Sequence, residues 1–460
     1  MNHPRATTDR RTFLGLALAG AAAVPLASCA PGGGGSSSAT TSAGASVTTD
    51  ASALGNVTIA QMDTWTDKTS LQAQWIVKVN AAFTQKYPNL KVKRTSGTFD
   101  DINKTLKLKL SDPSAPDVVP ANNGWQGIGT LAKAGLIKNL TPWVAAYGWD
   151  KRIPATIARQ HQVTPDGKSI GKGDFFGIPM AQGGFITIYY NRSKLAKLGV
   201  SVPTTFDAFQ DALAKAKAGG EIPMMIGTQD QWLSTTTLFA LMCNYAETQK
   251  ISDFVYGVGG TAADTGMKEA ATTYQAWAKA GYFPKNFAGT PSADSGTAFV
   301  GGSGVFYFYY SDSLPFQTEA KSNAFGTFLL PTQGDLRAVG ASNQNFSIAS
   351  NSKHADAAAL WLDFVSSRAA GELAVQTGIM PFLDTFEATA DTGPLLKDEL
   401  GELAGVQKSD GFVPYFDWAT PTMLDTMGAQ CQLLLAGKIT PEQLVAACQK
   451  DYDAFQKSQG

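Results

Sequence analysis

Hydrophobic and polar residues alternate with two different periods along the chain after residue 56. Val57 to Ala60 is a short β-prone run, and in the next segment Leu71, Trp75, Val79 and Phe83 recur at helical spacing. The same pattern then repeats twice. It predicts strands near 57–60, 90–93 and 117–119, and helices over about 70–87, 100–110 and 128–134.

The second half of the chain shows the same kind of alternation after a less regular stretch at 143–173. It predicts strands at 175–179, 185–190, 224–226 and 304–310, and helices at 206–218, 235–245 and 355–366, with helices dominating after residue 371. Alternating strands and helices favour parallel α/β sheets, and no short internal repeat is evident. Ligands of such sheets bind beyond the carboxyl ends of the strands, which directs attention to the loops at 62–69 and 121–127.

The first thirty residues have the pattern of an export signal. Arg10 and Arg11 precede an apolar run at 14–26, as in twin-arginine signals, and the run is short for a membrane span. Leu26-Ala27-Ser28-Cys29 resembles a lipobox, in which the cysteine thiol is lipidated and cleavage makes the cysteine the new N-terminus. We therefore expect a signal at 1–29, lipidation of Cys29, and a flexible linker rich in Gly, Ser, Ala and Thr at 30–56.

Composition excludes several kinds of partner. The 460 residues carry a formal net charge of −1, so there is no basic surplus for nucleic acid. Three histidines and four cysteines leave little material for a metal site, and we expect neither a metal nor another cofactor. Aromatic residues make up 10% of the chain, and composition alone cannot divide them between core and ligand site.

Three cysteines remain after Cys29. Cys431 and Cys448 fall on two predicted helices joined by a short turn, so a disulfide between them and free buried thiols both fit the sequence. Cys243 has no such neighbour, and the odd number leaves at least one free thiol in a monomer.

Six stretches, taken in order, give the chain a clear resemblance to extracellular solute-binding proteins of the maltodextrin-binding type. Each stretch is weak alone, and the run Tyr-Asn-Arg-Ser-Lys-Leu followed by Pro-Thr-Thr-Phe is the most specific. The stretches are 116–119, 134–140, 177–179, 189–195 with 203–206, 347–348 with 355–365, and 437–443.

The resemblance implies an α/β, two-lobed periplasmic-binding-protein fold of type II (Venus-flytrap), with a ligand cleft between the lobes. The expected lobes are 57–146 plus 326–366 and 147–325 plus 367–460. It also implies a lipoprotein held at the outer face of the cell membrane that captures a mono- or oligosaccharide by hinge closure. The expected partners are the permease subunits of an ABC importer, and the expected state is a monomer.

The resemblance further implies which loops hold the ligand. A sugar offers an apolar ring face to aromatic side chains and a girdle of hydroxyls to amides and carboxylates. The family often has Ala-Met before Gly-Xaa-Trp near residue 305, whereas this chain reads Val-Phe-Tyr-Phe-Tyr-Tyr, so the stacking residue expected there is either displaced or is a tyrosine. The expected ligand residues are Trp65, Asp67, Asn122, Asn123, Trp125, Gln182, Gln231, Trp232, Tyr309, Tyr310, Asp312, Asn343, Gln344, Asp417 and Trp418.

Other functions are less well supported by the residues. A secreted glycosidase would need paired carboxylates, and no local motif pairs them. The Gly-Xaa-Ser-Xaa-Gly match at 167–171 lies in the less regular stretch at 143–173 and not between a predicted strand and a predicted helix, and the His-Glu-Xaa-Xaa-His motif is absent from the sequence. We therefore expect a binding protein and not an enzyme. A binding protein for a peptide, a polyamine or a glycerol phosphate is the nearer alternative.

Overall fold

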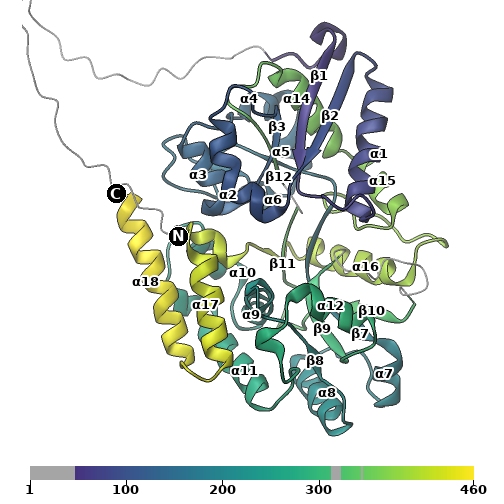
Figure 1. Cartoon of the computed structure of the whole chain (residues 1–460), viewed down its shortest axis with the longest axis vertical. Coiled ribbons are helices and arrows are strands. Elements are labelled where there is room, and N and C mark those ends of the chain that lie inside the picture. The colour runs from purple at the N-terminus through teal and green to yellow at the C-terminus, as the bar shows by residue number, and fades with distance from the viewer. Residues whose placement is uncertain (1–46, 312–322, 343–344, 460) are drawn as a thin grey trace, which may run out of the picture. The chain divides into compact units, whose positions relative to one another are not determined.

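Two β-sheets, each with its own helices, organise the body of the protein (Figure 1). The computed structural model describes residues 47–311, 323–342 and 345–459. We call the five-stranded sheet and its helices the first lobe, and the six-stranded sheet and its helices the second lobe. These lobes confirm the predicted two-lobed α/β class.

The first lobe has the strand order β2-β1-β3-β12-β6. Strands β1, β2 and β3 are parallel, and β12 runs antiparallel to both β3 and β6. The strands are β1 (Val57–Asp63), β2 (Leu90–Ser96), β3 (Val118–Ala121), β6 (Ile178–Pro179) and β12 (Asn345–Ile348). The helices are α1 (Leu71–Lys86), α2 (Phe99–Leu110), α3 (Ile128–Lys133), α4 (Thr141–Tyr147), α5 (Trp149–Arg152), α6 (Ala155–Arg159), α14 (Ala355–Val365) and α15 (Arg368–Thr377).

Helix α1 shows how the apolar spacing builds this lobe. Ser70 caps it by accepting a hydrogen bond from the backbone N–H of Ala73 (3.2 Å). Its buried face includes Trp75, whose indole N–H donates to the carbonyl of Ala370 in α15 (2.9 Å). Trp75 and Trp361 are fully buried, as their helical periodicity predicted.

The second lobe is built around β7, all nine residues of which are buried. Strand β9 pairs antiparallel with β7 on one side, and β10 and β11 pair antiparallel with it on the other. The strands are β7 (Gly183–Asn191), β8 (Met224–Met225), β9 (Phe306–Tyr310), β10 (Phe325–Phe328), β11 (Ala338–Ser342) and β13 (Phe412–Val413). The helices are α7 (Arg192–Lys197), α8 (Phe206–Ala218), α9 (Trp232–Tyr245), α10 (Thr248–Val255), α11 (Met267–Lys279), α12 (Ser292–Val300), α16 (Pro394–Lys408), α17 (Met423–Leu435) and α18 (Pro441–Gln459).

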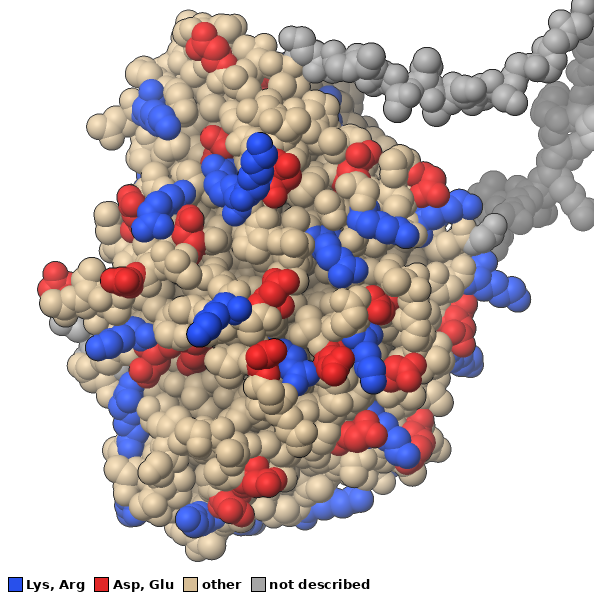
Figure 2. All heavy atoms as spheres, turned by 180° about the vertical axis from the view of Figure 1, so that it is seen from behind, with Lys and Arg blue, Asp and Glu red and all other residues tan. Residues whose placement is uncertain are grey.

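Short elements complete the body. A separate two-stranded sheet joins β4 (Gln162–Val163) to β5 (Asp174–Phe175). The 3-10 helices are η1 (Ala51–Leu54), η2 (Gly124–Gln126), η3 (Ala262–Thr265), η4 (Phe287–Gly289) and η5 (Phe416–Ala419). Figure 2 shows one face of the molecule, on which acidic and basic side chains are interspersed, in keeping with a net charge near zero.

The strand pairings correct the expected lobe boundaries. Strands β10 and β11 were expected in the first lobe and belong to the second sheet, whereas β6 was expected in the second lobe and belongs to the first sheet. Helices α5 and α15 also join the first lobe, because Trp149 donates to Asp363 (2.9 Å) and Ala370 accepts from Trp75. The second sheet is mainly antiparallel, whereas a parallel one was predicted. Strand partners are chosen by long-range packing, which the local pattern does not contain.

Candidate ligand-binding site

A pocket of about 840 Å³ lies between the two lobes. The first lobe contributes the loop after β1, the start of α2, and the segment from the end of β3 to η2. The second lobe contributes the start of α9, the ends of β9 and β11, the segment 415–418 and the start of α17. The carboxyl ends of the parallel strands β1 and β3 therefore open onto the pocket, as such sheets predict.

Eight of the expected ligand residues line this pocket, and they come from four separate segments. This structural result shows only that the fold brings them together. They are Asn122, Asn123, Gln231, Trp232, Tyr309, Tyr310, Asp417 and Trp418.

Four other expected residues lie outside the lining. Trp125 is 4% exposed and packs edge-on against Phe455 of α18, with ring centroids 5.0 Å apart. Gln182 is fully buried in the crossover between the sheets, where it forms an isolated bridge with Pro381. Both contact residues that are distant in the sequence, and their role as ligand residues stays a prediction.

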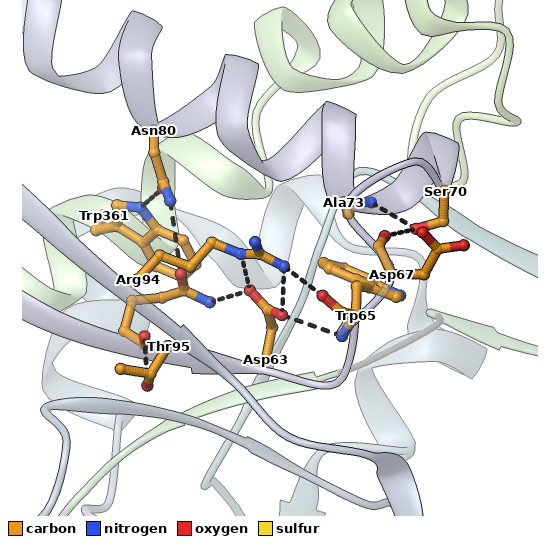
Figure 3. Close-up of polar contacts among 10 residues, drawn as sticks. Asp63, Trp65, Asp67, Ser70, Ala73, Asn80, Arg94, Thr95 and Trp361 are labelled. Carbon is orange, nitrogen blue, oxygen red and sulfur yellow. Dashed lines mark hydrogen bonds and ion pairs between the residues drawn. The ribbon is translucent and has the colours of Figure 1, made fainter.

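Trp65 and Asp67 belong to the loop after β1 (Figure 3). Neither of them lines the pocket. The Trp65 ring packs edge-on against Trp75, with centroids 6.2 Å apart. Asp67 is exposed and accepts hydrogen bonds from the backbone N–H (2.8 Å) and hydroxyl (2.7 Å) of Thr69, which lower the pKa of its carboxyl. Asp67 thus shapes its own turn. Asp312, Asn343 and Gln344 lie outside the described residues.

A buried charged network holds that loop (Figure 3). The side chain of Asp63 is fully buried, and Arg94 donates to its two oxygens at 2.6 and 2.8 Å. Arg94 also donates to the carbonyl of Trp65 (2.7 Å), and the backbone N–H of Trp65 donates to the Asp63 carboxylate (3.0 Å). Because Thr64 lies between them and lines the pocket, this network positions one wall of the site.

The two lobes touch directly at the pocket, where η2 meets η5. The side-chain N–H of Gln126 donates to the Asp417 carboxylate (2.9 Å) and to the Asp417 carbonyl (3.0 Å). Gly124 approaches so closely that a Cβ there would lie 2.2 Å from the Cβ of Trp418. Sequence reasoning missed Gln126, whose partner is 291 positions away.

The aromatic lining is strongly asymmetric between the lobes. Among the described residues, the second lobe supplies six aromatic side chains and the first lobe supplies Phe99 alone. Trp232 meets Tyr309 edge-on at 5.3 Å, and Tyr415 and Trp418 lie tilted at 5.2 Å. The six are Trp232, Phe239, Tyr309, Tyr310, Tyr415 and Trp418.

Gln231 carries backbone strain at the entrance to α9. Its φ of 69° lies in the left-handed region that glycine favours. The Gln231 carbonyl accepts from the Ser234 hydroxyl (2.5 Å), and its side-chain N–H donates to Gln432 of α17 (3.4 Å). Such strain is held where the surrounding contacts over-determine the backbone, and here it places Trp232 against the pocket.

Cys243, Cys431 and Cys448 are free thiols. Cys431 and Cys448 are both buried, so of the two arrangements that the sequence left open, the structure contradicts the disulfide. Burial raises the pKa of the Cys243 and Cys431 thiols to about 12, which leaves them inert at neutral pH. Arg10, Arg11 and Cys29 lie outside the described residues.

The described part of the chain contains neither a membrane-spanning helix nor a metal-binding cluster. No helix there is both long and apolar enough to cross a membrane. Within the same residues, no three His, Cys, Asp or Glu side chains are grouped so that they could hold a metal ion.

Comparison with known proteins decides the family. The profile of the family described as bacterial extracellular solute-binding protein matches residues 65–372. The chain belongs to this family. Membership makes it a binding protein with an extracytoplasmic location, as the sequence resemblance indicated.

Individual relatives are distant. A "multiple sugar-binding protein" of Streptococcus mutans is 24% identical over 300 residues, which are 63% of this chain and 67% of that protein. A "probable sugar-binding periplasmic protein" of Mesorhizobium japonicum is 32% identical over 105 residues, only 23% of either chain. The solved structure of a "chitin oligosaccharide binding protein" superimposes with a TM-score of 0.71 at 21% identity, covering 87% of this chain and 99% of that one, and so supports the fold.

The stability of this solute-binding protein should depend on pH through Asp417. Burial raises the pKa of the Asp417 carboxyl from 3.8 to about 7, against the opposing hydrogen bond from Gln126. The folded chain therefore keeps a proton that the unfolded chain has lost, so this contribution is complete below about pH 4 and disappears as pH rises through about 7. Urea unfolding should show a smaller fall in stability from pH 5 to pH 8 for Asp417→Asn than for the parent.

Other buried carboxyl groups also make the stability of both proteins depend on pH. Burial also raises the pKa of the Glu402 carboxyl, to about 8, and this contribution has the same sign and persists in both proteins. An equal fall in stability for parent and variant would show that Asp417 is ionised in the folded state.

Proposed function

We propose that this solute-binding protein captures a neutral carbohydrate outside the cell and delivers it to the permease of an ABC importer. The observation that carries the proposal is the pocket lining, in which aromatic faces of the second lobe stand opposite amides of the first. Ring faces of sugars pack on aromatics, and their hydroxyls pair with amides and hydroxyl groups. The names of the sugar-binding relatives support the same class of ligand.

The charges in the lining are compatible with a neutral ligand. Asp230 accepts from the backbone N–H of Ser292 (3.1 Å) and from its hydroxyl, and Asp417 accepts from Gln126. Lys104 and Asp425, of opposite sign, are both exposed. No convergent set of basic groups lines the described pocket, so an anionic solute such as a glycerol phosphate is disfavoured.

Capture would proceed by closure of the lobes. A ligand stabilises a closed form only through contacts that this form alone provides, so residues of both lobes must touch it. Asn122 and Asn123 of the first lobe and Trp232 and Tyr309 of the second are placed to do so. The family supports delivery to a permease. The export and lipobox motifs support anchoring through a lipid on Cys29 at the outer face of the membrane, and we propose that the anchored protein acts as a monomer.

Thermal unfolding with a panel of saccharides tests the proposal. A sugar at a hundredfold excess over its Kd should stabilise the protein by roughly 2.7 kcal/mol. Trp232→Ala should weaken that sugar about tenfold in calorimetry through loss of a ring contact, whereas Trp65→Ala, outside the lining, should leave affinity unchanged. In fractionated cells that produce the full chain, the sugar-binding activity should sediment with the membranes. In cells that produce the Cys29→Ser variant, it should appear in the soluble fraction.

The competing functions give different outcomes in the same panel. Stabilisation by a peptide or a polyamine, with none by any saccharide, would contradict the carbohydrate assignment. Hydrolysis of a bound glycoside would show that the protein is an enzyme and would contradict the proposed role in solute capture.

A further inference from the structure

Phe99, at the first position of α2, is an apolar side chain that the fold itself does not use. It stands three residues before Ile102 and seven before Leu106, so the three share one face of the helix. Ile102 and Leu106 are 1% and 3% exposed, whereas Phe99 is 48% exposed. The apolar stripe of α2 therefore runs out of the core and into the mouth of the pocket, which Phe99 and Ile102 both line.

Polar side chains share the pocket lining with Phe99. Asn103 and Lys104 are exposed on the next turn of α2, and both line the pocket. Asp425, also exposed, lines it from the start of α17 in the second lobe. An exposed ring with an amide and an ammonium on the next turn of the same helix is the chemistry that suits one more pyranose, with the ring face on Phe99 and hydroxyls on the polar groups.

Exposure differs widely between the residues that line the pocket. Trp418 is 4% exposed and Phe99 is 48% exposed, so Phe99 belongs to the solvent side of the lining and Trp418 to its buried side. A volume of about 840 Å³ lies near the upper end of the range of roughly 300 to 1,000 Å³ for sites that enclose drug-sized ligands, which are larger than one sugar ring.

We propose that Phe99, Asn103 and Lys104 form an outer subsite, and that the ligand is an oligosaccharide whose second or third ring stacks on Phe99. This inference rests on the proposed carbohydrate function and deepens it. Phe99 becomes the residue that selects chain length, while the aromatic side chains of the second lobe hold the innermost ring.

Calorimetry of the full chain with two saccharide series tests the subsite. The series are glucose, maltose and maltotriose, and N-acetylglucosamine with its β-1,4-linked dimer and trimer. Affinity should rise with length in the series that binds. Phe99→Ala should weaken the longest member about tenfold and leave the monosaccharide unchanged, because only the outer ring loses its stacking partner.

The same helix offers a matched control. Leu108 is 77% exposed and does not line the pocket, so Leu108→Ala removes an exposed apolar side chain from α2 without touching the ligand. Phe99→Leu keeps an apolar group and removes the ring, and should fall between parent and Phe99→Ala. Melting temperatures of all three variants separate a binding effect from damage to α2.

Each remaining outcome contradicts a different statement. A monosaccharide that binds as tightly as its trimer, or a Phe99→Ala variant that weakens all lengths equally or none, would overturn the outer subsite alone. Absence of binding by every member of both series, together with stabilisation by a peptide or a polyamine and by no saccharide in the thermal panel, would overturn the subsite together with the proposed function.

Discussion

Arg94→Ala should lower the free energy of unfolding by about 3–5 kcal/mol, because it leaves a buried carboxylate without its counter-charge. Asp63 is fully buried, and Arg94 reaches both of its oxygens with a fork of two N–H groups. Alanine would also free the carbonyl of Trp65, which accepts from the same guanidinium. Urea unfolding of parent and variant at pH 7 measures the difference.

A surface ion pair provides the control for Arg94. Arg368 and Glu372, one turn apart on α15, are 60% and 55% exposed and 3.6 Å apart. The Arg368 guanidinium also lies 4.5 Å from the centroid of the Phe386 ring, so Arg368→Ala should lower stability by no more than about 1 kcal/mol. A loss below about 1 kcal/mol for Arg94→Ala would mean that Asp63 is satisfied by its remaining donors, among them Gln61.

Arg94→Lys distinguishes charge from geometry at the same site. Lysine keeps the positive charge. It lacks the planar guanidinium, whose N–H groups donate at once to both Asp63 oxygens and to the Trp65 carbonyl. We expect an intermediate loss of stability and weaker ligand binding, since the loop carrying Thr64 would be held less firmly.

Gly124→Ala should damage both stability and binding, because Gly124 is where the two lobes touch beside the pocket. Its φ is +65°, and an added Cβ would lie 2.2 Å from the Cβ and 2.7 Å from the Cα of Trp418. The left-handed backbone costs alanine about 1–2 kcal/mol, and the overlap adds about 1–3 kcal/mol. Relief requires η2 and η5 to separate, which stretches the bonds from Gln126 to Asp417 and displaces Trp418.

Gly135→Ala measures the cost of the left-handed backbone without a clash, so its difference from Gly124→Ala gives the energy of the clash. Gly135 has nearly the same φ, +66°, and beyond its chain neighbours nothing lies within 4 Å of the place that an added Cβ would take. It should show the backbone cost alone and keep the affinity of the parent. Equal losses in the two alanine variants, measured by urea unfolding and by calorimetry, would show that the contact between η2 and η5 carries no energy.

Local features of the sequence predicted most elements correctly. Helix α8 begins and ends where its pattern places it, at Phe206 and Ala218, with Thr205 as the N-cap that accepts from the Ala208 N–H (3.1 Å). Capping and apolar spacing act within a few residues, so one short segment contains the necessary information. The resemblance in turn indicated the family, which the match over residues 65–372 confirms.

Trp125 and Trp418 show where such reasoning stops. Both follow polar residues in short loops, yet Trp125 packs under α18 while Trp418 lines the pocket. Phe99 carried a usable signal, because it extends the stripe of Ile102 and Leu106 past the core, whereas nothing near Gln126 in the sequence points to Asp417.

The sequence by itself determined the α/β class, the order of helices and strands, the family and the residue types suited to a sugar. Only the tertiary structure decided which lobe each strand joins and which aromatic side chains face the ligand. The physical reason is that hydrophobic burial favours a tryptophan equally in a core and against a ring-shaped ligand. The partners that distinguish these two places, Phe455 for Trp125 and Gly124 for Trp418, lie hundreds of residues away along the chain.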